Sequence, residues 1–350
     1  MDKYLTIHDT HTWLITGGAG FIGSHLAEAL LQNNQRVRIL DNFSTGKLEN
    51  IEEVRELISE EQRSSLEVIR GNVQDASVAQ QAVIGVDFIL HQAALGSVPR
   101  SFDNPLDSNA SNVTGFLTLL EAARRESERN GRIKSFVYAS SSSVYGDHPS
   151  LPKREDTVGQ VLSPYAASKR ANELYAQAFA GSVSFPIIGL RYFNVFGPRQ
   201  DPDGAYAAVI PRWINTILKG EPCIVYGDGE TSRDFCYVSN VVAANILSAL
   251  TGTTLIRETN TGSYEGRANV YNVAAGCQTS LLQLHNAIKE ALKKRSLLPA
   301  NSQLLHEEFR AGDVKHSLAD ISKISEALGY RPLVEVTAGL QKTVDWFQSK

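Results

Sequence analysis

The sequence predicts an α/β fold, with a doubly wound parallel sheet and a smaller α/β domain built onto it. The first observation is a short apolar run at residues 13–16 that leads into three glycines and then into apolar residues at helical spacing. The second is a regular alternation of strand and helix patterns that continues to residue 191. The third is that this alternation ends beyond Asn194, where the smaller domain is expected.

The glycine-rich turn after the first strand is typical of a dinucleotide-binding unit, and it makes the predicted sheet Rossmann-type. Gly17 lets the chain turn sharply off the strand, Gly20 lets the backbone approach a pyrophosphate, and Gly23 lets the helix pack closely on the sheet. The pyrophosphate then faces the free N–H groups and the positive end of the helix that begins near Phe21 and Ile22.

Asp41 ends the second predicted strand, residues 37–41, where a carboxylate holds the ribose hydroxyls of an adenosine. The same carboxylate repels a 2′-phosphate, so we expect NAD rather than NADP as the cofactor. A polar turn follows and is expected to surround the adenosine; it contains Asn42, Ser44, Thr45 and Gly46.

The next units repeat the strand and helix patterns. The predicted strands are residues 66–70, 88–92, 135–139 and 186–191, and the predicted helices are residues 79–84, 104–125 and 164–179. The polar loop after the third strand includes Asn72 and Val73, and the fourth strand ends at Gln92. Ala93 and Ala94 follow it, and their small side chains let a flat group lie across the strand end.

Beyond this region the chain contains a turn-rich loop at 197–204, a helix at 209–218, strands at 223–226 and 270–273, and two C-terminal helices. Residues 251–267 are expected to form an exposed loop. We therefore expect a NAD-binding domain of residues 1–195 with about 236–275. The smaller domain would contain residues 196–235 and 276–350.

The composition of the 350 residues excludes several classes of protein. The net charge of −4 gives no basis for a nucleic-acid or membrane surface, and no apolar run approaches the ~20 residues that span a bilayer. The N-terminus lacks the apolar segment of a signal peptide. Three scattered cysteines indicate a reducing compartment, so we expect a cytoplasmic protein. The eight histidines show no metal-ligand spacing, so no metal site is expected.

Tyr165 and Lys169 stand four residues apart near the start of a predicted helix, so they share one face. Ionising a tyrosine at neutral pH requires about 4 kcal/mol. The lysine ammonium group and the positive nicotinamide ring of NAD⁺ are plausible sources of that energy. Ser141 or Ser142, at the end of the preceding strand, would hydrogen-bond the same substrate oxygen. These residues would form a general base, its activator and an orienting donor.

Together these stretches resemble the extended short-chain dehydrogenases/reductases of the nucleotide-sugar epimerase and dehydratase group, over nearly the whole chain. The motifs that carry the resemblance are residues 17–23, 41–42, 140–146, 165–169, 191–197 and 232–235. Dehydratases of this group carry an Asp-Glu pair after the active serine or threonine. Ser142 and Ser143 occupy those positions here, so elimination of water is not expected.

Within the group, residues 91–101, 204–211 and 312–317 resemble the bacterial UDP-N-acetylglucosamine 4-epimerases of surface-polysaccharide pathways. In related UDP-galactose 4-epimerases the position of Ser317 sets substrate size, and its small side chain here implies room for a 2-acetamido group. The resemblance implies interconversion of UDP-N-acetylglucosamine and UDP-N-acetylgalactosamine through a 4-keto intermediate, with NAD tightly bound.

The resemblance also implies a set of site residues. Tyr192 joins the cofactor contacts, whereas Asn72 replaces the family's adenine-binding Asp and is expected to weaken that contact. The implied substrate contacts are Gly96, Ser97, Ser142 and Ser143 around the sugar, Asn194, Ala208 and Val209 at the uridine and diphosphate end, Tyr226 at the uracil, Arg233 and Arg310 at the diphosphate, Asp313 at the ribose, and Ser317. Surface ion pairs for the two arginines and a core position for Tyr226 are the alternatives.

Helices 104–125 and 164–180 resemble the pair that forms the family's four-helix dimer interface, so we expect a homodimer. One alternative function is a UDP-N-acetylglucosaminuronic acid 4-epimerase, in which Ser97 and Arg100 would contact the 6-carboxylate. A net NAD-dependent oxidoreductase and a non-catalytic NAD-sensing protein are the others. The intact Ser141, Tyr165 and Lys169 argue against the last.

Overall fold

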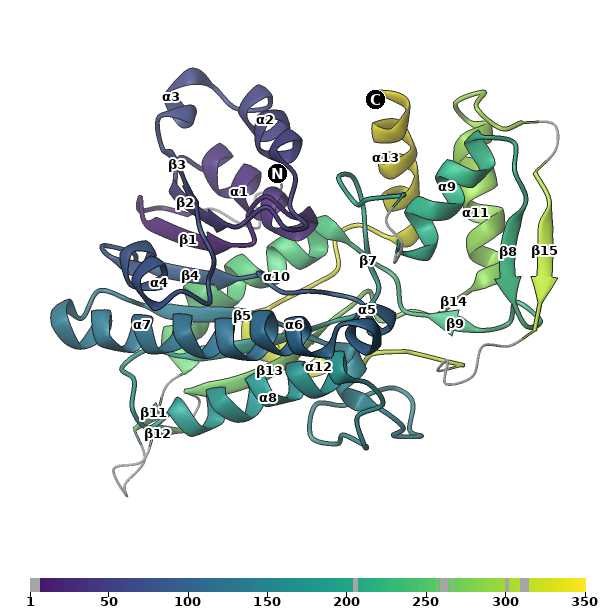
Figure 1. The fold of residues 1–350 in the computed structure, drawn as a ribbon. Helices are drawn as coiled ribbons and strands as arrows, with labels where there is room; N and C mark the ends of the chain where they lie inside the picture. Colours follow the sequence, from purple (N-terminus) through teal and green to yellow (C-terminus); the bar gives the residue numbers. More distant parts are fainter. Residues whose placement is uncertain are drawn as a thin grey trace.

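The computed structural model describes residues 7–203, 207–255, 257–258, 264–265, 267–299, 302–308 and 315–350. Its centre is a seven-stranded sheet in the order β13-β6-β5-β4-β1-β2-β3 (Figure 1), in which every pairing is parallel. The strands are β1 (Thr12–Thr16), β2 (Arg36–Asp41), β3 (Leu66–Arg70), β4 (Phe88–His91), β5 (Ser135–Ser141), β6 (Ile187–Tyr192) and β13 (Ala268–Val273). This order confirms the predicted Rossmann-type fold. From β1 the chain adds strands first on one side (β2, β3) and then on the other (β4, β5, β6), so the strand order reverses between β1 and β4.

Helices cover both faces of the sheet because successive side chains of each strand point to opposite faces. In β1, Trp13 and Ile15 pack into the cluster beneath α1 (Phe21–Gln32) and α10 (Val238–Thr251). Leu14 packs into the cluster on the other face. That face is covered by α4 (Ala76–Val83), α7 (Gly115–Asn130) and α8 (Pro164–Phe179).

A third apolar cluster holds the smaller region together, at the right of Figure 1. Its helices are α9 (Val209–Leu218), α11 (Leu281–Lys293) and α13 (Val336–Gln348), which pack around Trp213, Ile288 and Leu340. Beside them β8 (Cys223–Tyr226) pairs in parallel with β15 (Leu304–Glu307). Two short pairs join the regions: β7 (Val195–Phe196) with β10 (Cys236–Tyr237), and β9 (Ser232–Arg233) with β14 (Thr279–Ser280).

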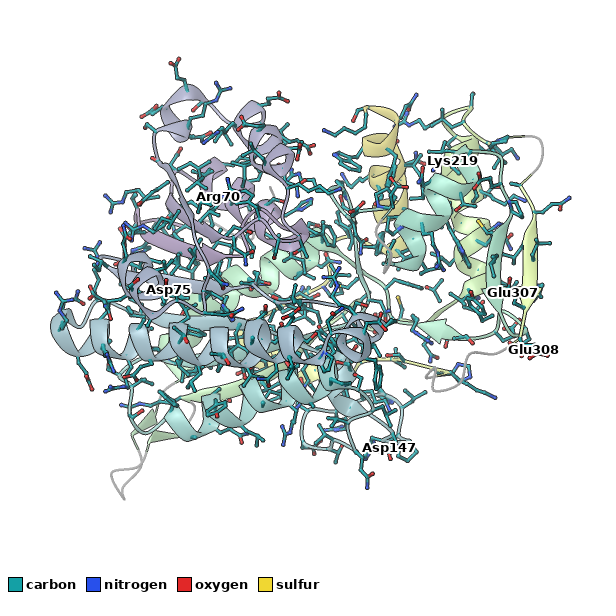
Figure 2. The ribbon with its side chains drawn as sticks, viewed as in Figure 1. Arg70, Asp75, Asp147, Lys219, Glu307 and Glu308 are labelled. Carbon is teal, nitrogen blue, oxygen red and sulfur yellow. The ribbon has the colours of Figure 1, made fainter. Side chains whose placement is uncertain are left out.

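Many charged side chains lie at the periphery, as Asp75 and Lys219 do in Figure 2. Asp75 also explains why α4 begins three residues earlier than predicted, since its carboxylate accepts the backbone N–H groups of Ser77 and Val78. Among the described residues, no helix is both long and apolar enough to cross a membrane.

Several predicted elements differ from the structure. The expected helix at 104–125 is divided into α6 (Pro105–Asn109), a π-helical turn η1 (Ala110–Thr114) and α7, which continues to Asn130 and ends at Gly131 with φ +64°. A short helix, α5 (Val98–Asp103), precedes them. The charged segment after β2 forms two helices, α2 (Leu48–Glu56) and α3 (Glu60–Arg63), because Ser59 caps the second with a capping box.

The sequence patterns did not predict α10, and the C-terminal part contains one more helix than predicted. The additional helix, α12 (Ser322–Leu328), buries Ile324 and Leu328 against the cluster that also contains Trp13. The expected loop at 251–267 is also wrong in its described part. It contains a 3-10 turn η3 (Gly252–Leu255) and an antiparallel pair of β11 (Arg257–Glu258) with β12 (Tyr264–Glu265).

Candidate active site

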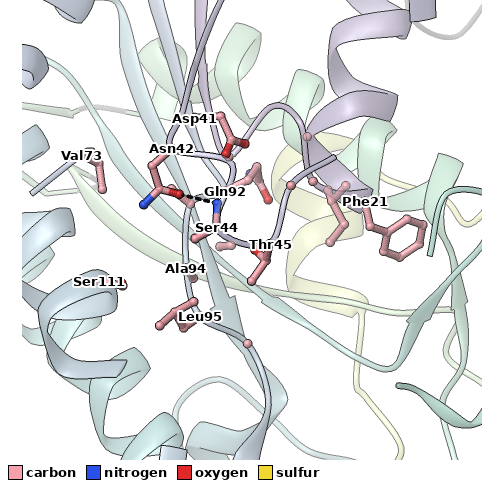
Figure 3. A pocket seen from close by; sticks show the side chains of 18 of the residues that line it. Phe21, Asp41, Asn42, Ser44, Thr45, Val73, Gln92, Ala94, Leu95 and Ser111 are labelled. Atoms are coloured by element: carbon pink, nitrogen blue, oxygen red, sulfur yellow. Dashed lines mark hydrogen bonds between the residues drawn. The ribbon is translucent and has the colours of Figure 1, made fainter. Parts of the chain in front are cut away.

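A cavity of about 400 Å³ opens at the carboxyl ends of the central strands, beside the point where the strand order reverses (Figure 3). All the residues predicted to bind the cofactor line it: Gly17, Gly20, Phe21, Ile22, Gly23, Asp41, Asn42, Ser44, Thr45, Gly46, Asn72, Val73, Gln92, Ala93, Ala94, Tyr165, Lys169 and Tyr192. The structure therefore brings together segments that are far apart in the sequence.

Glycines let the backbone segments around the end of β1 approach one another closely. Gly17 has φ +69°, and a Cβ there would lie 2.8 Å from the backbone nitrogen of Ala93. A Cβ on Gly23 would strike the carbonyl oxygen of Gly17. The N-cap of α1 is Gly20, which offers no side-chain acceptor to the first N–H groups of the helix. Those groups are therefore suited to an anionic ligand such as a pyrophosphate.

Asp41 is fixed at the wall of the cavity by two backbone donors. Its Oδ2 accepts from the N–H of Ala19 at 2.9 Å, and its Oδ1 accepts from that of Phe43 at 2.8 Å. Beside it, Asn42 Oδ1 accepts the N–H of Ser44 at 3.0 Å, as drawn in Figure 3. A carboxylate held in this way suits ribose hydroxyls and repels a 2′-phosphate, so the cavity fits NAD. Asn72 lines the same cavity and accepts from the N–H of Gln74 at 3.1 Å.

The proposed catalytic residues meet where β5 ends against α8. Lys169 is buried, and its Nζ donates to the carbonyl oxygen of Ala139 at 2.8 Å and lies 6.0 Å from the centre of the Tyr165 ring. Burial lowers the pKa of Lys169 to about 8. Burial also raises the pKa of Tyr165, while a hydrogen bond with Ser141 acts in the opposite direction. A base and its orienting donor are thus already in contact.

The two serine candidates are placed differently. Ser141 lines the cofactor cavity, and its Oγ accepts from the backbone N–H and the hydroxyl of Ser143 at 3.2 and 2.9 Å. Ser142 begins a 3-10 turn, η2 (Ser142–Tyr145), and is not among the described residues that line the cavity. Geometry therefore favours Ser141 as the group beside Tyr165.

A second cavity, of about 260 Å³, adjoins the first, and Asn194 and Val195 line both. Its walls include five of the predicted substrate contacts: Asn194, Ala208, Val209, Tyr226 and Arg233. Tyr226 is half-buried, so it is not a core aromatic residue. Asn194 has φ +27°, a conformation rarely adopted by residues other than glycine, and backbone strain of this kind clusters at functional sites.

Arg233 and Ser317 both donate a hydrogen bond to the carbonyl oxygen of Ser232. The guanidinium Nη1 of Arg233 donates to the carbonyl oxygens of Ser232 and Lys315 at 3.0 and 3.1 Å, and the N–H of Ser317 donates to that of Ser232 at 3.1 Å. Arg310 and Asp313 lie outside the described residues.

Around the predicted sugar site, Gly96 lines the cofactor cavity. Ser97 instead caps α5 with φ +101° and accepts the N–H of Arg100. In the described part of the chain, neither Ser97 nor Arg100 lines either of these two cavities.

Sequence analysis missed a buried asparagine that joins the two sides of the site. Asn112 lies in the π-helical turn; its side chain accepts the N–H of Leu95 at 2.7 Å and donates to the Leu95 carbonyl and the Ser168 hydroxyl. It therefore ties the loop after β4 to the helix that carries Tyr165. The only sequence signal is a polar residue within an otherwise helical segment.

Comparisons with known proteins agree with this geometry. Residues 13–259 match the NAD dependent epimerase/dehydratase family. The chain is 34% identical to a UDP-glucose 4-epimerase of Mycolicibacterium smegmatis, over 96% of this chain and 98% of that protein. It is 38% identical to the structure of a UDP-N-acetylglucosamine 4-epimerase from Methanobrevibacter ruminantium M1 in complex with UDP-N-acetylmuramic acid, with a TM-score of 0.83 and coverage of 97% and 99%.

A third relative is the structure of a UDP-glucuronic acid 4-epimerase from Bacillus cereus in complex with UDP-glucuronic acid and NAD. It is 30% identical to this chain, has a TM-score of 0.79, and is matched over 97% of this chain and 99% of that one. The family match covers more than half of the chain, and the relatives are matched over nearly their whole length. The chain therefore belongs to the NAD-dependent epimerase/dehydratase family.

Proposed function

We propose that the protein is a 4-epimerase that interconverts UDP-N-acetylglucosamine and UDP-N-acetylgalactosamine, for use in surface-polysaccharide synthesis. One observation carries the proposal. The Tyr165, Ser141 and Lys169 cluster lies in a cavity that fits NAD, and this cavity shares Asn194 with a second one that contains Arg233. A cofactor and a nucleotide sugar could therefore meet at the catalytic tyrosine. The 38% identity to a UDP-N-acetylglucosamine 4-epimerase supports this choice of substrate.

In this mechanism Tyr165 takes the proton of the sugar 4-hydroxyl and returns it after the new configuration forms. NAD, when bound, supplies the acceptor and donor of a hydride at C4, so the sugar passes through a 4-keto intermediate. Ser141 orients the sugar oxygen toward Tyr165. Arg233 anchors the diphosphate, since a guanidinium group suits phosphate geometry. The keto sugar then turns about its bond to the anchored diphosphate and presents its other face.

A UDP-N-acetylglucosaminuronic acid 4-epimerase remains the second candidate, supported by the relative that acts on UDP-glucuronic acid. Arg100, the cation expected to contact a 6-carboxylate, is not in the walls of the two cavities that the described residues form, and this favours the first candidate. The backbone N–H of Ser317 bonds to the same Ser232 carbonyl as Arg233, and its small side chain agrees with an N-acetylated sugar, although Ser317 is not among the described residues that line the two cavities.

The test is to incubate the purified protein with UDP-N-acetylglucosamine, UDP-glucose and UDP-N-acetylglucosaminuronic acid separately, without added NAD. Proton NMR of the anomeric signal reports the configuration of the product. Conversion of the first substrate to the galacto form is expected. Conversion of the uronic acid alone would identify the second candidate. In a parallel incubation with added NAD, stoichiometric formation of NADH, followed by its absorbance, would indicate a net oxidoreductase instead.

We also propose a homodimer whose interface is built on α6, α7 and α8. These helices lie along one side of the molecule in Figure 1, and several apolar side chains on or beside them are exposed. Leu106 of α6 is 82% exposed, Phe102 of α5 60%, and Leu174 of α8 52%. A second copy that covers them would remove this apolar surface from water.

A cytoplasmic location agrees with the three cysteines, which are all free thiols.

A further inference from the structure

We propose that Glu173 is a positioning residue, which holds the serine-bearing end of β5 against the helix that carries Tyr165 and Lys169. This inference rests on the proposed function, because it assigns Glu173 a part in keeping Ser141 beside the catalytic tyrosine. Glu173 itself is fully buried, and the reaction as described above does not use it.

The carboxylate of Glu173 joins three elements. Its Oε1 accepts from the hydroxyl of Ser140 on β5 at 2.7 Å and from Nε of Arg191 on β6 at 2.8 Å. Its Oε2 accepts from Nη2 of Arg191 at 2.9 Å and from Nη1 of Arg170 at 2.7 Å. Hydrogen bonds to an ionised acceptor are stronger and more directional than neutral ones, and the Arg191 pair is bidentate.

The charge state supports this role. Burial acts to raise the pKa of Glu173, but the contacts with Arg191, Ser140 and Arg170 outweigh it, so the pKa lies below its ordinary value. Glu173 is therefore a carboxylate at neutral pH. It has two oxygens and accepts four donors, which leaves it no freedom to move without losing a bond.

Helix α8 forms hydrogen bonds with two consecutive residues of β5. Lys169 donates to the carbonyl oxygen of Ala139, and Glu173, one helical turn further on, accepts from the hydroxyl of Ser140. The next residue of the strand is Ser141, which hydrogen-bonds Tyr165. Without the outer contact, the end of β5 would lose one of the hydrogen bonds that hold it to α8, and Ser141 would sample positions away from Tyr165.

Two single variants separate this role from a general contribution to stability. Ser140→Ala removes the hydrogen bond between Glu173 and β5 and leaves both arginine pairs intact. Because Ser140 also lines the cofactor cavity, the NAD content of this variant is checked and should equal that of the wild type. Arg170→Ala is the matched control, since it removes a different contact of the same carboxylate, near the surface, and leaves the Ser140 and Arg191 contacts in place. Both variants change one hydrogen bond to Glu173.

The measured quantity is the pKa of Tyr165. A substitution that only lowered the stability of the fold would leave this pKa unchanged. The groups that face Tyr165 are Ser141 from β5 and Lys169 from its own helix. His91 of β4 faces Lys169 and stays neutral, because burial and the lysine charge lower its pKa to about 3. The difference in tyrosinate absorbance between each protein and the same protein with Tyr165→Phe isolates this one titration.

We expect Ser140→Ala to lower kcat for UDP-N-acetylglucosamine roughly tenfold per folded molecule, with KM changed by less than about twofold. The pKa of Tyr165 should rise, because the Ser141 hydrogen bond that lowers it is weakened. Arg170→Ala should match the wild type in both measurements. The enzyme is used with its resident cofactor throughout.

The proposal is overturned if Ser140→Ala keeps the wild-type kcat and the wild-type Tyr165 titration, or if Arg170→Ala shows the same losses. In either case, wild-type turnover that is abolished by Tyr165→Phe would leave the proposed function standing. If the wild type converts no UDP-sugar, the proposed function fails. The Tyr165 titration then still decides whether Glu173 positions Ser141, because it needs no substrate.

Discussion

Lys169 bonds to the strand rather than to the tyrosine whose ionisation it was expected to promote. Its Nζ donates to the Ala139 carbonyl, and burial alone would leave Tyr165 harder to ionise than a free tyrosine. The hydroxyl of Ser141 is the protein group that acts against this effect. In the proposed mechanism the positive charge of bound NAD⁺ would act in the same direction as Ser141 and favour ionisation of Tyr165.

Replacing Tyr165 with phenylalanine removes the proton acceptor and keeps the ring. We expect kcat to fall by a factor of about 10²–10⁴, which is the typical contribution of a general base. The bound NAD and the melting temperature should be nearly unchanged, because the hydroxyl contributes one hydrogen bond to Ser141. Turnover by NMR and cofactor content by absorbance measure the two effects. Near-normal turnover would remove Tyr165 from the mechanism.

At the scale of elements, Asp234 joins three segments around the second cavity. It follows β9, is buried, and accepts the backbone N–H groups of Ala275, Gly276 and Ala319 at 2.9, 3.1 and 3.2 Å. It thereby fixes Arg233, its neighbour in sequence, relative to the chain after β13 and the chain before α12. Burial raises its pKa to about 6 despite these bonds.

This carboxyl makes folding depend on pH. The folded state binds a proton on Asp234 near pH 6, whereas the unfolded chain binds it only near the ordinary value of 3.8. Between these values the folded state holds more protons, so stability rises as the pH falls. Relative to Asp234→Asn, the wild type should gain about 2 kcal/mol of unfolding free energy from pH 6 to 4. Urea unfolding at both pH values tests this; a gain that instead appears as the pH rises would contradict it.

Local sequence patterns predicted most of the elements, and the exceptions have identifiable causes. The helix at 209–218 and the strand at 223–226 were predicted with their observed bounds, because each combines a clear period with a clear boundary signal. The helix α12 has only seven residues, too few to show a helical period. The π-helical turn around Asn112 is stabilised by contacts with Leu95 and Ser168, which no local pattern contains.

The residues of the candidate site divide in the same way, into those that a local motif predicts and those that depend on contacts between distant segments. Residues that belong to one short motif, such as Gly17, Gly23 and Asp41, could be assigned from the sequence. Contacts between distant segments could not: Ser140 and Glu173 are 33 residues apart, and Gln92 and Asn245, which hydrogen-bond beneath the cavity, are 153 apart. The roles of the predicted residues stay predictions until they are tested by substitution.

At the scale of the whole molecule, Arg199 joins the region of the central sheet to the smaller region, close in sequence to Asn194 and Val195, which line both cavities. It is buried and pairs with Glu28 of α1 and with Glu53 of α2, at 2.8 Å for the latter. Glu53 also accepts from the indole nitrogen of Trp346 on α13 at 3.0 Å. The expected division into a NAD-binding and a smaller domain stays a prediction, although α12 packs with the core of the large sheet.

The exposed apolar side chains beside α8 predict self-association. The double substitution Leu106→Glu and Leu174→Glu places charges where a second copy would bury apolar surface, so the protein should sediment as a monomer at micromolar concentration while the wild type sediments as a dimer. Leu305→Glu is the control, since Leu305 is exposed on β15, away from these helices. A wild type that is monomeric would contradict the proposed interface.

The central claim is that hydrogen leaves C4 of the sugar and returns to it without entering water. The most direct measurement is to run the epimerisation of UDP-N-acetylglucosamine to equilibrium in D₂O, exchange the hydroxyl positions back in H₂O, and analyse the product by mass spectrometry. We predict a product that carries no deuterium on carbon, because Tyr165 handles only the hydroxyl proton. Deuterium at C4 would show that the carbon itself exchanges a proton with solvent, and it would contradict the mechanism.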